Sequence, residues 1–185
     1  MSTPGVLVLV VGPSGAGKDT LINAAREKLA DDPQFVFPRR VVTRASTAFE
    51  DHDSIDTEDF VRAVTAGEFA LHWQAHNLGY GVPRTIESQI AKGRVVVCNV
   101  SRTVIEQARA RFPRVHVVYI DASPEVRAAR IVKRGRDAAG GSRSDPDRAG
   151  PGRPSYDVLI DNSDALEGAV ACFMVALLEL AAETS

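Results

Sequence analysis

The sequence predicts an α/β fold in which a parallel core sheet is covered by helices on both faces. Apolar and amphipathic stretches alternate along the 185 residues, which is typical of successive strand–helix units. Two apolar stretches, residues 94–100 and 115–120, are nearly continuous and do not alternate with polar residues. Strands of that composition are buried on both faces, so helices must cover the sheet above and below.

The first strand, residues 6–11, runs directly into a glycine-rich segment at residues 12–20. Gly12, Gly17 and Lys18 have the spacing of a phosphate-binding loop, or P-loop. The glycines let successive backbone N–H groups face a phosphate, and the following helix adds its positive end. Lys18 reaches the terminal phosphates as a point charge. We therefore expect a three-layer P-loop fold that binds a nucleotide through Gly12, Pro13, Ser14, Gly15, Ala16, Gly17, Lys18, Asp19 and Thr20.

Asp19 stands where many P-loops have a serine or threonine that binds Mg²⁺, and the hydroxyl comes one residue later, at Thr20. A carboxylate suits a hard cation, so Asp19 and Thr20 are candidate ligands for Mg²⁺. Asp19 could equally serve only to favour the first turn of the helix. Both roles remain open at this point. The variant favours small-molecule kinases over switch GTPases.

The remaining elements follow from apolar periodicity and from turn residues. Helices are expected at 18–30, 57–66, 85–92, 101–112, 123–134 and 164–182. Further strands are expected at 35–37, 40–43, 69–73 and 156–160, with a turn at 79–81. We expect a single domain, residues 1–185, with a core made of residues 1–37, 85–132 and 156–185. Residues 38–84 then form an acceptor-binding insertion, and residues 133–155 form a mobile lid.

The insertion carries polar side chains that suit a phosphorylated acceptor. Arg44 ends a strand and could form a bidentate pair with a phosphate. The acidic cluster at residues 50–53 could bind sugar hydroxyls or a metal, or it could be a solvated turn. His72 and His76 suit hydrogen bonds to a polar ligand better than metal binding. Tyr80 could donate its hydroxyl to a phosphate, or it could simply pack.

The expected lid is rich in glycine and proline and too polar to form a core, so we expect it to be mobile. Arginines on such a segment can close over a nucleotide, because phosphoryl transfer needs cationic donors and exclusion of water. They could also merely confer solubility. The arginines in question are Arg130 and Arg134 on the preceding helix, followed by Arg136, Arg143, Arg148 and Arg153.

Composition limits the partners and the location of the protein. The formal net charge of −2 gives no sign of nucleic-acid binding, and no apolar run approaches 18 residues, so a membrane span is not expected. Cys98 and Cys172 lie in apolar segments and are expected to be buried free thiols. Together these features predict a cytoplasmic protein. A dimer is possible, but composition does not specify the oligomeric state.

Several separated motifs resemble the guanylate kinase superfamily in order and spacing. They comprise the loop at 12–18, Thr43-Arg44, Gly67-Glu-Phe69, Tyr80-Gly81 and the segment from Arg130 to Gly135. Gly-Lys-Asp-Thr at 17–20, the segment 70–76, Tyr-Gly-Val-Pro at 80–83 and Asn99-Val-Ser-Arg102 are similar to one branch, the ribose 1,5-bisphosphate phosphokinases of phosphonate breakdown. The likeness covers about residues 6–136 and returns at Asp161-Asn162.

This resemblance implies transfer of the γ-phosphoryl group of ATP, with Mg²⁺, onto the 1-phosphate of ribose 1,5-bisphosphate. It implies catalytic roles for Lys18, Arg130 and Arg134. It implies that the acceptor is bound by Arg44, Glu50, His72, His76, Tyr80 and Asn99. Guanylate kinases read guanine with acidic residues where His72 and Asn99 stand here, and this exchange disfavours guanine. A guanylate or other nucleoside monophosphate kinase remains an alternative, as does a non-catalytic binding module.

Overall fold

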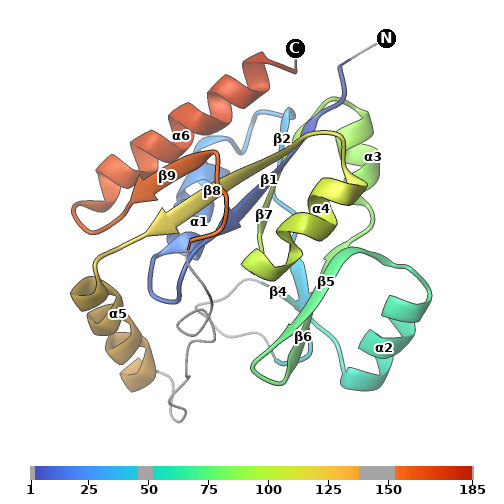
Figure 1. The fold of residues 1–185 in the computed structure, drawn as a ribbon, viewed down its shortest axis with the longest axis horizontal. Coiled ribbons are helices and arrows are strands. Elements are labelled where there is room, and N and C mark those ends of the chain that lie inside the picture. The colour runs from blue at the N-terminus through green and yellow to red at the C-terminus, as the bar shows by residue number, and fades with distance from the viewer. Residues whose placement is uncertain (1–2, 46–51, 138–152, 185) are drawn as a thin grey trace.

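The core is a five-stranded parallel sheet (Figure 1). The computed structural model describes residues 3–45, 52–137 and 153–184, without the side chains of residues 134–137. In spatial order the core strands are β2 (Phe35–Val36), β7 (Val95–Asn99), β1 (Val6–Val11), β8 (Val115–Asp121) and β9 (Val158–Asp161). Every pairing between them is parallel, so the predicted sheet is confirmed.

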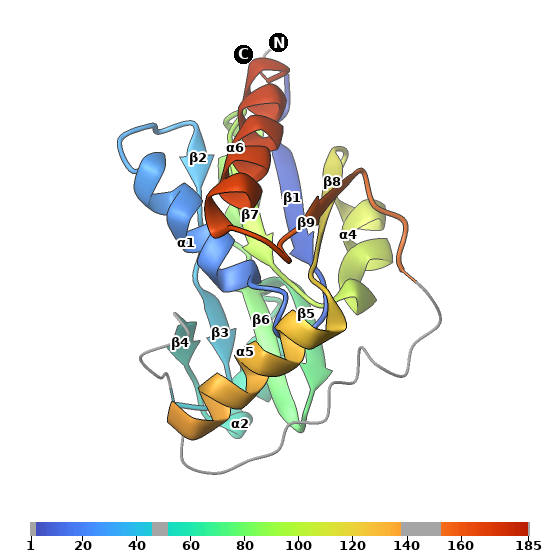
Figure 2. The ribbon, with the colours of Figure 1, turned by 90° about the vertical axis from the view of Figure 1, so that its left-hand side faces the viewer.

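Helices cover both faces of this sheet, which completes the three predicted layers (Figure 2). The even-numbered residues of β1 pack into a core shared with α1 (Lys18–Lys28) and α6 (Leu166–Ala182). Its odd-numbered residues pack into a second core shared with α3 (Ile86–Ala91) and α4 (Ile105–Arg111), which follows a short 3-10 turn, η1 (Arg102–Val104). All six residues of β1 are buried because both faces of the strand are covered.

The insertion forms a second sheet, which was not expected in this form. Its elements are β3 (Arg40–Val42), β4 (His52–Ser54), α2 (Thr57–Thr65), β5 (Phe69–Ala75) and β6 (Leu78–Pro83). The sheet order is β4-β3-β6-β5, and a small core of Phe60, Ala63 and Phe69 packs beneath it. Strand β4 includes His52, which is buried, and Asp53, which is exposed. Of the alternatives left open for residues 50–53, a solvated turn is therefore wrong for these two residues, because they lie in a strand.

The predicted turn at residues 79–81 was also wrong. These residues lie inside β6, and the chain turns instead at His76 and Asn77, whose φ angles are 53° and 60°. The two glycines of this segment allow aromatic rings to pack closely against the strand. A Cβ atom at Gly79 or Gly81 would come within 2.6 Å of the ring of Phe60 or Phe69, respectively.

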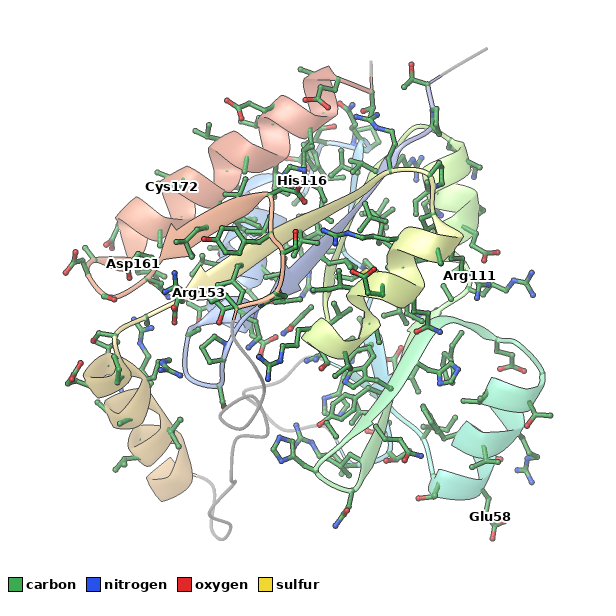
Figure 3. The ribbon with its side chains drawn as sticks, viewed as in Figure 1. Glu58, Arg111, His116, Arg153, Asp161 and Cys172 are labelled. Carbon is green, nitrogen blue, oxygen red and sulfur yellow. The ribbon has the colours of Figure 1, made fainter. Side chains whose placement is uncertain are left out.

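Helix α2 is capped by Asp56, whose carboxylate accepts a hydrogen bond from the backbone N–H of Asp59 at 2.7 Å. Two further predictions, on the start of the lid and on Cys172, need correction. Helix α5 (Pro124–Asp137) continues past residue 134, so the first residues of the predicted lid are helical. Cys172 is exposed on α6 (Figure 3), whereas Cys98 is buried as predicted, and burial raises the pKa of its thiol to about 12.

The insertion and α5 both extend from the same end of the core sheet, opposite the chain termini (Figures 1 and 2). That end carries the carboxyl ends of the parallel strands, where ligands bind in open α/β sheets. Among the helices of the described ranges, none has both the length and the apolar composition that crossing a bilayer requires.

Candidate active site

The loop between β1 and α1 has the backbone of an anion cradle. Gly12, Gly15 and Gly17 have φ angles of 149°, 80° and 91°, which few other residues adopt. Gly17 is the N-cap of α1, and no side chain caps the helix there. The first N–H groups of α1 are therefore left for a bound anion, in the field of the positive helix end.

Lys18 folds back over this loop. Its Nζ atom donates to the carbonyl oxygens of Gly12 at 2.6 Å and of Pro13 at 3.1 Å. The ammonium group is thereby held at the mouth of the cradle, within reach of the phosphates that the loop would bind. This position agrees with the role predicted for Lys18, which remains a prediction.

Arg130 and Asn162 hold the other side of the loop. The Arg130 guanidinium donates to the carbonyls of Gly15 at 3.3 Å, Ala16 at 3.4 Å and Asn162 at 2.9 Å. The side chain of Asn162 donates to Ala16 O at 2.8 Å and is buried. Arg130 therefore positions the loop through these backbone contacts. No role was predicted for Asn162 from the sequence, although the resemblance to the guanylate kinase superfamily includes this residue.

Arg130→Lys tests this positioning role. Lysine keeps the charge but cannot reach three carbonyls at once, because it lacks the planar fork of arginine. We expect kcat/KM for ATP to fall at least tenfold and the free energy of unfolding to fall by about 1–2 kcal/mol. Steady-state kinetics and chemical denaturation measure the two effects. Arg109→Lys, on α4, is the matched control and should behave as wild type; an Arg130→Lys protein equal to that control would refute the role.

The other predicted lid arginines are only partly within the described residues. Arg134 and Arg136 lie on α5, but their side chains are outside the described part. Arg143 and Arg148 lie outside the described residues altogether, as does Glu50 of the insertion. Arg153 donates to the Asp121 carboxylate at 2.8 Å and lies over the Tyr119 ring, next to β8 (Figure 3). This ion pair joins the segment before β9 to the end of β8.

Asp19 lies in the first turn of α1 and contacts residues of β7 and β3. Asn99, at the end of β7, donates its amide to the Asp19 carboxylate at 2.6 Å. Arg40, at the start of β3, lies 3.8 Å from the same oxygen. The structure thus brings two predicted residues, Asp19 and Asn99, into direct contact and adds Arg40, to which sequence reasoning assigned no role.

The remaining predicted acceptor residues lie on the second sheet. The Tyr80 ring stacks on Trp73, with 5.2 Å between ring centres and an interplanar angle of 4°. His72 is exposed between two buried residues of β5, and His76 is exposed in the turn that follows. Arg44 is half-buried just beyond β3, and its carbonyl oxygen lies 3.2 Å from Nε2 of His52. Asn99, by contrast, lies at the end of β7 and lines a small pocket with Asp19 of α1 and Arg40 of β3.

Comparison with known proteins shows the family to which this chain belongs. Residues 5–177 match the family model described as guanylate kinase, so the chain belongs to the guanylate kinase family. The fold is similar to the crystal structure of guanylate kinase from Anaplasma phagocytophilum, with a TM-score of 0.67. That match has 23% sequence identity and covers 99% of this chain and 88% of the other, so it shows the fold alone.

Proteins of similar sequence show to which branch of the guanylate kinase family the chain belongs. The chain is 55% identical over 160 residues to ribose 1,5-bisphosphate phosphokinase PhnN of Rhodopseudomonas palustris, covering 86% of this chain and 81% of that one. It is 51% identical over 168 residues to the protein of the same name from Methylobacterium radiotolerans, covering 91% and 94%. The Brucella abortus protein is 46% identical over 183 residues, covering 97% and 95%. Within the guanylate kinase family, the chain therefore belongs to the ribose 1,5-bisphosphate phosphokinases.

Proposed function

We propose that this protein uses ATP to phosphorylate ribose 1,5-bisphosphate, giving 5-phospho-α-D-ribose 1-diphosphate during phosphonate catabolism. The observation that carries the proposal is the intact P-loop, held by Lys18, Arg130 and Asn162. Beside it, Asn99 at the end of β7 and His72 on the second sheet stand where guanylate kinases have acidic residues. The relatives named above carry this activity in their names. We also infer a cytoplasmic location, in which the buried Cys98 stays reduced.

The chemistry is an in-line transfer between two phosphates. An oxygen of the acceptor's 1-phosphate attacks the γ-phosphorus, the bond to the β–γ bridging oxygen breaks, and ADP leaves with that oxygen. The attacking oxygen is already anionic, so no strong general base is required. The protein therefore acts by positioning and by neutralising charge, through the loop N–H groups, Lys18 and the arginines of α5.

The residues around Asp19 suit a magnesium ion. Asp19 offers a carboxylate that is about 40% exposed, Asn99 orients one of its oxygens, and Thr20 follows on the same turn. Mg²⁺ in kinases is typically bound by one or two protein oxygens together with phosphates and waters. Asp19 and Thr20 would hold it, and the ion would offset the negative charge of the phosphate chain.

Asp19→Asn tests the metal role against a purely structural one. Asparagine keeps an oxygen that accepts the Asn99 hydrogen bond but removes the charge. We expect the Mg²⁺ concentration for half-maximal activity to rise about tenfold or more, as is typical when a metal-site residue is changed. A titration of activity with Mg²⁺ at fixed ATP measures this shift. Asp31→Asn, just beyond α1, is the control. An unchanged Mg²⁺ dependence would assign Asp19 to the helix turn alone.

The identity of the product tests the proposed function. The protein is incubated with ATP, Mg²⁺ and ribose 1,5-bisphosphate, and the phosphorus NMR spectrum is followed. We expect the signal of the 1-phosphate to be replaced by the two coupled signals of a diphosphate, while the 5-phosphate signal persists. ATP hydrolysis with no new diphosphate on the sugar would contradict the proposal.

A further inference from the structure

Arg40 is a half-buried cation to which no role has yet been assigned. It is the first residue of β3, and only 16% of its side chain is exposed. Its guanidinium lies 5.9 Å from the centre of the Tyr80 ring and 3.8 Å from the Asp19 carboxylate. The latter distance allows an ion pair but exceeds that of a hydrogen bond. Its charge also opposes the rise in the pKa of Cys98, which places the guanidinium near β7.

The hydrogen-bond donors of Arg40 have no acceptor in the protein, as far as the described residues show. A guanidinium carries five N–H donors in a planar fork that matches a phosphate. Burying such a group without acceptors is unfavourable unless a ligand or water supplies them. The neighbouring Arg39, in contrast, has acceptors for its donors: it pairs with Asp53 at 3.0 Å and donates to His52 O at 3.0 Å.

The side chains around Arg40 suit an anionic group such as a phosphate. Arg40 lines a small pocket together with Asp19, Asn23, Arg26 and Asn99, from α1 and β7. Two guanidinium groups and one carboxylate leave a positive excess there, and the two amides can bind hydroxyl groups. The pocket lies on the acceptor side of α1, whereas Lys18 and Arg130 contact the loop itself.

We propose that Arg40 binds the non-reacting phosphate of the acceptor, the 5-phosphate of ribose 1,5-bisphosphate, and so selects a bisphosphate. This inference rests on the proposed function. The reacting 1-phosphate must lie beside the loop, in line with the γ-phosphoryl group. The second phosphate then extends toward β3, where Arg40 supplies unmatched donors above Tyr80. Arg40 is thus a specificity-determining residue rather than a participant in the transfer.

The test measures binding of a fragment that carries only the 5-phosphate. Ribose 5-phosphate is used as a competitive inhibitor against ribose 1,5-bisphosphate, with wild type, Arg40→Gln, Arg40→Lys and the control Arg39→Gln. We expect Arg40→Gln to weaken inhibition about 10- to 100-fold, as expected for lost charge-assisted hydrogen bonds. Arg40→Lys should retain part of it, Arg39→Gln should equal wild type, and KM for ATP should be unchanged throughout.

The same series separates failure of this inference from failure of the proposed function. If wild type does not turn over ribose 1,5-bisphosphate, the proposed function fails. If wild type is active and Arg40→Gln and Arg40→Lys are both inhibited by ribose 5-phosphate as wild type is, the role of Arg40 is refuted while the function stands. Circular dichroism shows whether Arg40→Gln folds; if it does not, Arg40→Lys decides. Unchanged inhibition of Arg40→Lys by ribose 5-phosphate refutes the role of Arg40. Weaker inhibition with an unchanged KM for ATP supports that role.

Discussion

Lys18→Ala is expected to lower kcat/KM by about a thousandfold or more, because it removes the cation that the P-loop holds beside the migrating phosphoryl group. Loss of a single preorganised donor to a transition-state charge reaches that size in other enzymes. The Lys18 ammonium is held in place by the carbonyls of Gly12 and Pro13, so the wild-type charge requires little reorganisation during reaction. Coupled ADP-release kinetics measure the effect.

The fold should survive this change. Lys18 makes two hydrogen bonds to the loop, and losing them is worth about 1–3 kcal/mol in total. Lys28→Ala, exposed at the end of the same helix, is the matched control and should keep full activity. Activity of Lys18→Ala within a few-fold of that control would rule out the proposed role of Lys18.

Gly12→Ala is expected to have the largest effect on stability. Gly12 has a φ of 149°, and a Cβ atom there would lie 1.9 Å from the carbonyl oxygen of Ile120, on the neighbouring strand. Backbone strain and forced displacement of β8 together are expected to lower the free energy of unfolding by about 2–5 kcal/mol. ATP binding should weaken as well, because the loop must move to relieve the clash.

Chemical denaturation of Gly12→Ala and of Gly168→Ala provides the comparison. Gly168 lies near the start of α6, and a Cβ atom there would meet nothing within 4 Å. The same substitution at Gly168 should therefore leave stability unchanged or raise it by up to about 1 kcal/mol. Equal stabilities of the two variants would show that the close approach of Gly12 to Ile120 is not a constraint on this fold.

The core of the fold could be predicted because its determinants are local in sequence. The apolar run of β1, the glycines of the loop and the amphipathic face of α1 follow one another without interruption. The parallel sheet then follows from continuous apolar strands. Lys18 and Asp19 were placed for the same reason, since their positions depend on the loop alone.

The insertion could not be predicted to the same extent because long-range packing decides it. Gly79 and Gly81 suggested a turn, but the rings of Phe60 and Phe69 require glycine there within a strand. Strand β4 is short and polar, and it exists because it pairs with β3. The importance of Arg40 depends on contacts with residues 21 positions earlier and 40 positions later, which no local pattern reveals.

Asn162 and Cys172 illustrate two further limits of prediction from the sequence. Asn162 supports the P-loop from 146 positions away, and only its match to a family motif pointed to it. Cys172 lies in an apolar helix, yet it faces outward, because α6 buries only the side that packs against the core sheet. The apolar character of a segment therefore did not settle which of its residues are buried.

The most direct test of the account compares acceptors. With ATP and Mg²⁺ held constant, ADP release is measured with ribose 1,5-bisphosphate and with GMP over a range of acceptor concentrations. We predict turnover with the sugar bisphosphate and kcat/KM for GMP lower by at least about a thousandfold, since Asn99 and His72 offer no carboxylate to the N–H groups of guanine. A preference for GMP would contradict the assignment and make this protein a divergent guanylate kinase.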